Sequence, residues 1–378
     1  MTQKIAFIRK GRVPLANQAV AEALQHHFPA HRVEMFDIKT MLTQRPAVLL
    51  TNLLHTWRDY GVEIRRGRKR AKDCFFRTPY LFHTIKTLIA QRLSPAEYAF
   101  SFQMQSLFDA SVPGLPHFVY TDHTNLANNL YPIHDDARLF SPAWIALEKT
   151  IYQNACRIFT RSSNITQSLV EQYQCDPYKV SCVYAGSNVS HRDEPLDNDN
   201  YHNKNILIVG IDWERKGGPE LLAAFEQVLA VHPDAHLTIV GCTPQVTLPH
   251  CHVLGRLPLA EVNDHYRQAS IFCLPTRLEP FGIVFIEALS YRLPIVATCI
   301  GAIPDFVREG ENGYLVQPGD SSRLAQALIT LLDEPERCGR FGARGYQIAQ
   351  ENYTWEKVGL RMKEGIHDAV AMRLNESM

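Results

Sequence analysis

Short apolar runs, typical of buried strands, alternate along this chain with longer segments of helical periodicity. Because strands that alternate with helices form parallel sheets covered by helices, the pattern predicts an α/β protein. In a first series we expect strands at residues 4–8, 32–36, 98–102, 117–120, 158–160 and 180–184, and helices at 16–27 and 162–173. In a second series we expect strands at residues 206–210, 236–240, 270–274 and 295–297, and helices at 219–231, 259–269, 321–332 and 338–351.

A polar stretch at residues 190–203 separates the two series and is typical of a linker between domains. We therefore expect two Rossmann-like domains, at residues 1–190 and 204–354, followed by an amphipathic helical tail from Trp355 to the end. Ligands of such domains bind at the carboxyl ends of the strands, so the two domains are expected to face a central cleft.

The composition is that of a globular enzyme, with 378 residues, 46% hydrophobic and 21% charged. Lys and Arg (39) balance Asp and Glu (39), which argues against nucleic acid as a partner. The nine cysteines are scattered without a C-x-x-C pair, as in proteins with reduced thiols. We expect a cytoplasmic location, because we find no signal-peptide pattern and no apolar stretch long enough to span a bilayer.

Two glutamates, Glu279 and Glu287, are separated by seven residues after the expected strand 270–274. A Pro and a Gly follow Glu279, and the residues from Ile283 onward are compatible with a helix. The start of such a helix offers unbonded N–H groups and a positive dipole end, which suit a diphosphate. Glu279 would lie in the loop beside that ligand and Glu287 about two turns further on. For either glutamate alone, a solvated surface position is the alternative interpretation.

A second loop, residues 210–218, follows the expected strand 206–210 and places Arg215 and Lys216 beside two glycines. Glycine lets a ligand approach the backbone closely, and an arginine side chain forks onto phosphate oxygens. The loop therefore suits an anionic ligand, with a solvated basic turn as the alternative. The His-Cys-His run at 250–252 lacks a second group of ligands, so we interpret it as structural and expect no metal site.

The segment from Glu279 to Glu287 resembles the donor-site signature of the retaining family 4 glycosyltransferases, also called glycosyl transferases group 1, which have the GT-B fold. That signature has two glutamates around a Pro-Phe-Gly core, then a Pro-containing strand and a Gly-containing turn, here residues 293–298 and 301–307. The resemblance covers nearly the whole second domain and is faint in the first. It implies an acceptor domain at 1–190, completed by the helix 355–378, and a nucleotide-sugar donor domain at 204–354.

The resemblance implies a retaining, metal-independent hexosyltransferase with a nucleotide-diphosphate sugar as co-substrate and no cofactor. Lys216 and Arg215 would hold the diphosphate, although the family arginine commonly stands directly after the glycine, where this chain has Ile211. Glu279 would hold the sugar hydroxyls and Glu287 the nucleotide ribose. Further donor contacts are expected from Gly11, Arg256, Phe281, Gly282, Ile283 and Val284.

The first domain departs more from the family pattern. His123, in the polar loop after the strand 117–120, is the candidate to orient the sugar or the acceptor, with Asp122 as its competitor. Gly11 stands alone where the family often has two glycines. The alternatives are a nucleotide-sugar epimerase, a phosphorylase of the same fold, or a non-catalytic sugar-nucleotide-binding protein. A dehydrogenase is disfavoured because the chain has no G-x-G-x-x-G motif.

Six Lys and Arg residues lie between Arg65 and Lys72, with apolar residues at 48–50 before them and at 75–76 after them. Such a patch can hold anionic lipid headgroups, which would place the protein peripherally at the inner face of a membrane. An anionic soluble acceptor and a solvated loop are the other interpretations. The sequence leaves open the donor sugar and nucleotide, the oligomeric state, and whether the acceptor is a glycan, a lipid or a small molecule.

Overall fold

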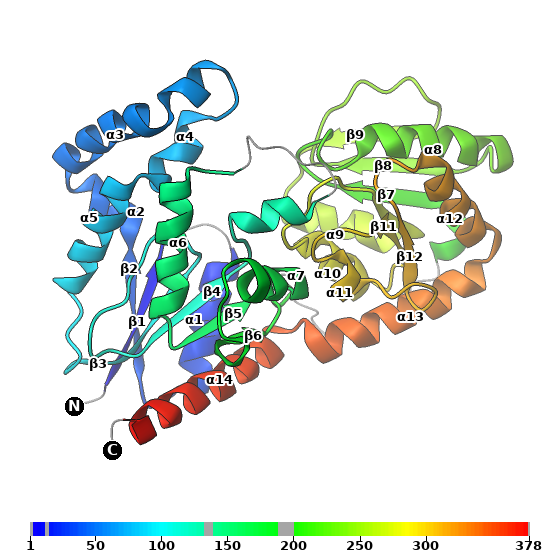
Figure 1. Cartoon of the computed structure of the whole chain (residues 1–378). Helices are drawn as coiled ribbons and strands as arrows, with labels where there is room; N and C mark the ends of the chain where they lie inside the picture. Colours follow the sequence, from blue (N-terminus) through cyan, green and yellow to red (C-terminus); the bar gives the residue numbers. More distant parts are fainter. Residues whose placement is uncertain (1–2, 12–14, 132–138, 188–199, 377–378) are drawn as a thin grey trace. The chain divides into compact units, whose positions relative to one another are not determined.

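The computed structural model describes residues 3–11, 15–131, 139–187 and 200–376. Most of the expected linker at 190–203 lies outside these described residues. The chain forms two compact units. The first comprises Met1–Leu130, His134–Ala185 and Trp355–Met378, and the second comprises Tyr131–Ile133 and Gly186–Thr354. Each unit is an α/β structure around one parallel sheet, as the alternating pattern predicts (Figure 1).

The sheet of the first unit has the strand order β2-β1-β3-β4-β5-β6. Its strands are β1 (Lys4–Arg9), β2 (Arg32–Asp37), β3 (Tyr98–Met104), β4 (His117–Thr121), β5 (Arg157–Thr160) and β6 (Val180–Cys182). Its helices are α1 (Leu15–His27), α2 (Ile38–Thr43), α3 (Pro46–Arg65), α4 (Ala71–Cys74), α5 (Pro79–Ala90), α6 (Pro142–Asn154), α7 (Ser163–Gln167) and α14 (Trp355–Glu376). The single helix expected at 162–173 is α7 followed by a π-helical stretch, Ser168–Gln172.

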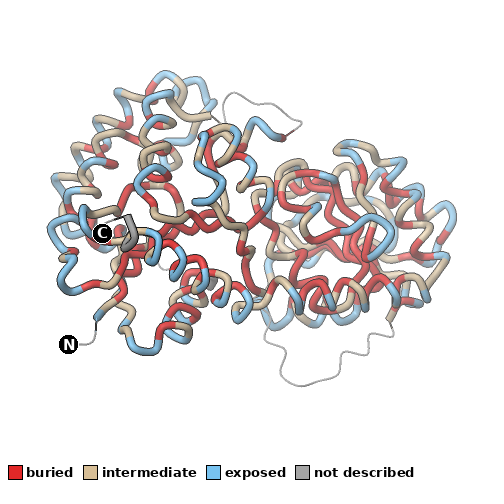
Figure 2. Tube along the Cα trace, turned by 60° about the horizontal axis from the view of Figure 1, so that its bottom comes forward, coloured by how far each residue is buried: buried red, intermediate tan, exposed pale blue. Residues whose placement is uncertain are grey.

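Helices cover both faces of the first sheet, because its central strands are apolar on both sides. On one face, Phe7 and Phe102 pack with residues of α1 and α14; on the other, Ile8 packs with residues of α2 and α5. Figure 2 shows these strands as buried tubes beneath partly exposed helices. Helix α14 follows the last residue of the second unit, yet it buries Val358 and Met362 in the core of the first.

The sheet of the second unit has the strand order β12-β11-β10-β7-β8-β9. Its strands are β7 (Asn205–Val209), β8 (His236–Val240), β9 (Cys251–Gly255), β10 (Ile271–Leu274), β11 (Ile295–Thr298) and β12 (Gly313–Val316). Its helices are α8 (Gly218–Val231), α9 (Leu259–Gln268), α10 (Ile283–Ser290), α11 (Ile303–Phe306), α12 (Ser321–Asp333) and α13 (Pro335–Asn352). Strands β9 and β12 were not expected; both are edge strands with partly exposed residues, so they lack a continuous apolar run.

In the second unit the chain reverses direction across the sheet beside its first strand. From β7 it continues outward to β8 and β9, and then it returns to form β10 on the other side of β7. Ligands of open parallel sheets bind where the strand order reverses, just beyond the carboxyl ends of the two strands. The loop after β7 and the loop after β10 therefore lie together at this switch point.

These two loops pack so closely that one position in the first admits only glycine. Gly217, between β7 and α8, has a φ of +75°, and a Cβ there would lie 1.9 Å from the carbonyl oxygen of Pro275 in the loop after β10. Gly310 has a similar φ of +73°, but a Cβ there would meet no atom within 4 Å. The two glycines thus share a left-handed backbone conformation, but only at Gly217 would an added Cβ clash with a neighbouring loop.

We expect Gly217→Ala to destabilise the second unit by more than Gly310→Ala does. The left-handed backbone alone costs an alanine about 1 kcal/mol, and the clash at residue 217 forces the two loops apart in addition. Urea unfolding of both variants measures the difference between the two losses in free energy. Equal losses would show that the close packing of the loops contributes nothing.

Candidate functional site

Lys216 and Glu279 form a buried ion pair at the switch point of the second unit. The two residues are separated by 62 others in the sequence, and they meet because β7 and β10 are neighbours in the sheet. The Lys216 ammonium donates a hydrogen bond to Oε2 of Glu279, and both residues are more than nine-tenths buried. Burying both charges has a desolvation cost that their attraction only partly repays. Such a pair at a switch point is therefore a candidate for ligand chemistry rather than for stability.

Arg215 joins the same two loops. Its guanidinium Nη1 donates to the carbonyl oxygen of Leu278 at 2.8 Å, and its Nε lies 3.5 Å from Oδ2 of Asp212. Its own carbonyl accepts hydrogen bonds from the backbone N–H of Arg277 at 2.8 Å and from the hydroxyl of Thr276 at 3.0 Å. Arg215 therefore holds the loop that carries Glu279, with its guanidinium still partly exposed.

Helix α10 begins at this switch point, directly after Gly282. Gly282 has a φ of +90°, and a Cβ there would lie 2.6 Å from the ring of Phe285 and 3.0 Å from Cγ of Glu279. Ile283 and Val284, both half-buried, form the first turn, where backbone N–H groups have no partner within the helix. The helix start and the Lys216 ammonium thus place two sources of positive potential at the same strand ends.

Glu287 is a buried carboxyl on α10 rather than a solvated surface residue. It accepts a hydrogen bond of 3.2 Å from the hydroxyl of Tyr266 on α9, whose ring stacks on that of Tyr291 at 5.3 Å. Burial raises the pKa of Glu287 to about 7. Its carboxyl is therefore partly protonated near neutral pH, and either form can hydrogen-bond a hydroxyl group.

The remaining expected donor residues lie in different surroundings. Phe281 is buried, with its ring edge-on to Phe306 at 5.4 Å, so it packs the core beneath the loop. Arg256 is exposed and follows the edge strand β9, which is two strands away from β7 in the sheet. Gly11 lies in the first unit, with a φ of +77°, and its N–H donates to Oδ1 of Asp37 at 3.1 Å.

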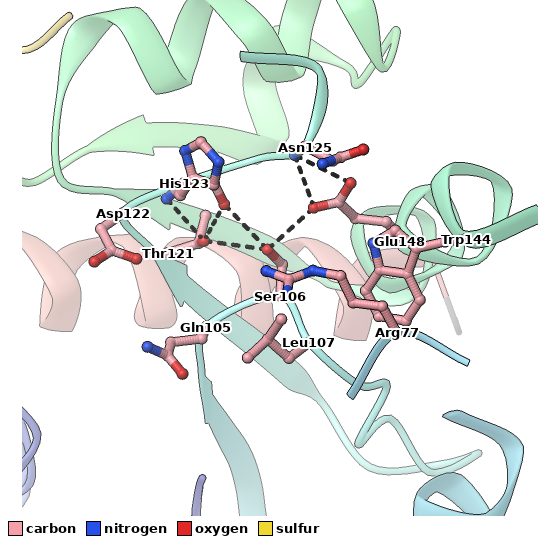
Figure 3. A pocket seen from close by; sticks show the side chains of 10 residues that line it. All are labelled: Arg77, Gln105, Ser106, Leu107, Thr121, Asp122, His123, Asn125, Trp144 and Glu148. Atoms are coloured by element: carbon pink, nitrogen blue, oxygen red, sulfur yellow. Dashed lines mark hydrogen bonds between the residues drawn. The ribbon is translucent and has the colours of Figure 1, made fainter. Parts of the chain in front are cut away.

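The first unit contains a cavity of about 100 Å³ beyond the carboxyl ends of β3 and β4, shown with its lining side chains in Figure 3. His123 lines it; its carbonyl accepts hydrogen bonds from the hydroxyls of Ser106 (3.1 Å) and Thr121 (2.8 Å). Burial lowers the pKa of His123 to about 4, so its imidazole is neutral at physiological pH. Asp122, the competing candidate, also lines the cavity and lies 3.5 Å from Nη1 of Arg161.

The cavity has one buried carboxylate that the sequence did not bring to notice, Glu148 on α6. It accepts hydrogen bonds from the hydroxyls of Tyr173 and Tyr152 and from the backbone N–H of Asn125 at 3.1 Å. Burial raises its pKa to about 7. A signal was present, because Glu148 falls one turn after Trp144 on the apolar face of an amphipathic segment.

Metal ligands come together at one place among the described residues. His26 and His27, at the end of α1, approach Glu356 at the start of α14, with imidazole-to-carboxylate distances of 3.6 and 3.8 Å. Two of these three side chains are largely exposed, and the cluster contains no residue of either site described above. We assign no metal to it.

Comparison with known proteins places these features in a family. Residues 203–334 match the model of the family described as Glycosyl transferases group 1. The second unit is a group 1 glycosyl transferase domain. The expected family and the expected GT-B fold are thus confirmed.

Curated relatives of this chain include the D-inositol 3-phosphate glycosyltransferase of Corynebacterium glutamicum (strain R). It is 28% identical over 281 residues, which are 67% of this chain and 67% of the relative. The phosphatidyl-myo-inositol mannosyltransferase of Mycobacterium leprae is 34% identical over 178 residues, 44% of this chain and 47% of the relative. For four curated relatives, these two among them, the match spans between 43% and 67% of the relative's own length.

Solved structures show a likeness of fold over nearly the whole chain. Sucrose-phosphate synthase from Thermosynechococcus elongatus has a TM-score of 0.65 at 17% identity, covering 98% of this chain and all of the other. HepE of Anabaena, solved in complex with UDP and glucose, has a TM-score of 0.64 at 16% identity over 97% of this chain and 99% of its own. Among the described residues of this chain, we find no helix with the length and apolar character needed to cross a bilayer.

The buried Glu287 predicts a pH dependence of stability. Its pKa is raised from the ordinary 4.5 to about 7, so between these values the folded state binds a proton that the unfolded state releases. Stability should therefore fall as the pH rises from about 4.5 through about 7, by up to about 1.4 kcal/mol for each pKa unit. Glu148 should add a similar dependence.

Urea unfolding of wild type and Glu287→Gln between about pH 5 and about pH 8 measures this slope. The variant should lose less stability over the interval, because an amide has no proton to release. The control is Glu214→Gln, a change at an exposed glutamate after β7, which should keep the wild-type profile. Parallel profiles for Glu287→Gln and wild type would contradict the prediction.

Proposed function

We propose that this protein is a retaining glycosyltransferase that moves a hexose from a nucleotide-diphosphate sugar to an acceptor, without a divalent metal. The observation that carries the proposal is the buried Lys216–Glu279 pair at the switch point of a group 1 domain. The names of the relatives support it, because they are glycosyltransferases and one is described as GDP-mannose-dependent. The Anabaena structure contains UDP and glucose.

The proposed chemistry follows from charge at the strand ends. As the bond from sugar to phosphate breaks, negative charge grows on the departing diphosphate. Lys216 and the N–H groups at the start of α10 are positioned beside each other to stabilise that charge, as a metal ion would elsewhere. Arg215 would contribute to the binding of the diphosphate, and it also holds the loop that carries Glu279 through its hydrogen bond to Leu278.

The two glutamates would bind the donor rather than exchange protons with it. Glu279 would accept hydrogen bonds from sugar hydroxyls when Lys216 turns toward phosphate. Glu287 would accept one from the nucleotide ribose, in line with its buried, partly protonated carboxyl. Retention would result if departure and attack take place on the same face of the sugar, with the leaving phosphate taking the proton of the acceptor.

On the acceptor side, the proposal uses the first-unit cavity. His123 is neutral there, so it can hydrogen-bond a hydroxyl without adding a cation. The acceptor is a glycan, a lipid or a small molecule, and we propose a cytoplasmic protein in peripheral contact with an anionic membrane through the segment from Arg65 to Lys72. The relatives whose names contain phosphatidylinositol support a lipid acceptor.

The test of the proposal must remove the ion pair without leaving one charge buried alone, because an unpaired buried charge costs about 3–5 kcal/mol. We therefore expect the double variant Lys216→Met/Glu279→Gln to fold and to lose at least about 100-fold in turnover, as when a preorganised charge contact is removed. The measurement is release of nucleoside diphosphate from a panel of UDP, GDP and ADP sugars, with circular dichroism as the check on folding.

The matched control is Lys204→Met/Asp234→Asn. It removes a Lys–Asp pair of 2.8 Å elsewhere in the second unit, and it should leave turnover unchanged. Wild-type turnover in the Lys216/Glu279 double variant would overturn the proposal. Conversion of the donor without any acceptor would favour an epimerase, and a requirement for free phosphate would favour a phosphorylase.

A further inference from the structure

Helix α3 of the first unit has a largely polar buried face, which is the reverse of the usual amphipathic pattern. Asn52, Thr56 and Tyr60 are buried at intervals of four residues. The Asn52 amide donates to the carbonyl oxygen of Phe75 at 2.7 Å, and the Tyr60 hydroxyl donates to that of Arg77 at 2.7 Å. These hydrogen bonds hold α3 on the short 3-10 turn, Phe75–Arg77, that follows α4.

The outward face of α3 is apolar. Leu50, Leu53, Leu54 and Trp57 are 64%, 46%, 72% and 53% exposed. Their spacing of three, four and seven residues places them on one stripe of the helix, which we call the α3 stripe. Folded chains rarely leave contiguous large apolar side chains in water, so a stripe of this kind marks a surface that is covered by a partner.

A basic segment begins where the α3 stripe ends. Arg65 lies at the last turn of α3, and most of the basic residues that follow are exposed: Arg66, Arg68, Arg70 and Lys72. Lys69 is the half-buried exception, and its ammonium donates to the carbonyl oxygen of Leu139 at 2.6 Å. This contact anchors the basic segment. Of the exposed cations, Arg70 pairs with Asp73 at 2.7 Å and Arg68 lies 3.8 Å from Glu63, in ion pairs that stay open to solvent. Figure 1 shows α3 and α4 next to each other within the first unit.

We propose that the α3 stripe and the basic segment together dock on an anionic lipid bilayer, with the leucines and Trp57 inserted between lipids and the cations on the headgroups. A bilayer offers both things that this surface requires, an apolar interior and a negative boundary. Tryptophan is also enriched at the membrane interface. A soluble anion would leave the α3 stripe in water, and a second copy of this chain would bring like charges together.

This inference deepens the membrane contact in the proposed function and rests on that function for its role in glycosyl transfer. The inference adds the residues of the α3 stripe as those that insert into the bilayer. They lie before the basic segment, on an outward helix face that is ordinarily polar. Such a surface would bring the first-unit cavity to the layer in which a lipid acceptor resides.

Co-sedimentation of the full chain with vesicles tests the proposal. We expect binding to vesicles of phosphatidylcholine with phosphatidylglycerol to exceed binding to phosphatidylcholine alone by about tenfold or more, and to weaken with salt. Leu54→Glu/Trp57→Glu should lower binding to the anionic vesicles at least about tenfold, since it removes inserted apolar surface. Arg65→Gln/Arg66→Gln should lower it by a similar factor, because each cation contributes roughly fivefold.

The control is Tyr178→Glu, which places one glutamate at another exposed large side chain of the first unit, 84% exposed, and should bind like wild type. The proposal would be overturned if the wild-type protein did not bind anionic vesicles, or if the Leu54/Trp57 variant bound them as well as wild type does. A further contrary outcome is a wild-type protein that forms dimers and binds no vesicles, while the Leu54/Trp57 variant is monomeric. Turnover of donor with a soluble acceptor, measured in parallel, separates failure of this inference from failure of the proposed function.

Discussion

The pairing of β7 with β10 is the constraint on which the candidate donor site depends. The two strands are parallel neighbours, with Ile206 opposite Ile271, so the loops that follow them emerge side by side. Hydrogen bonds between Arg215 and residues of the second loop hold the two loops together. The backbones also lie close to each other where Gly217 packs against Pro275. A lysine and a glutamate far apart in the chain are thereby held as a buried pair.

The two units show different uses of buried charge. In the second, Lys216 and Glu279 neutralise each other at a helix start that already favours anions, so a diphosphate could exchange with the carboxylate as the partner of the lysine. In the first, His123 is kept neutral by burial, while Glu148 is surrounded by donors. The candidate site of the second unit thus contains a buried ion pair, whereas the cavity of the first unit is lined by a neutral imidazole and a hydrogen-bonded carboxyl group.

Helix α3 reverses the rule that organises the rest of the fold. Elsewhere apolar residues point into the sheets, as Val358 and Met362 of α14 do. On α3 the residues that hydrogen-bond to neighbouring segments are inside, and Leu54 and Trp57 are outside. The basic segment was visible in the sequence, but the outward direction of the leucines was not, because periodicity gives the faces of a helix without saying which one is buried.

The sequence by itself determined the α/β class, most central strands and the family, since apolar strand runs and the Glu279–Glu287 signature are local patterns. It did not determine the edge strands, whose residues are only half apolar. Only the tertiary structure decided that Lys216 meets Glu279, because strand order, not chain distance, makes β7 and β10 neighbours. It likewise decided how deeply Glu148 is buried, and so the direction of its pKa shift: the amphipathic pattern places Glu148 on the apolar face, but the depth of burial depends on the segments packed against that face.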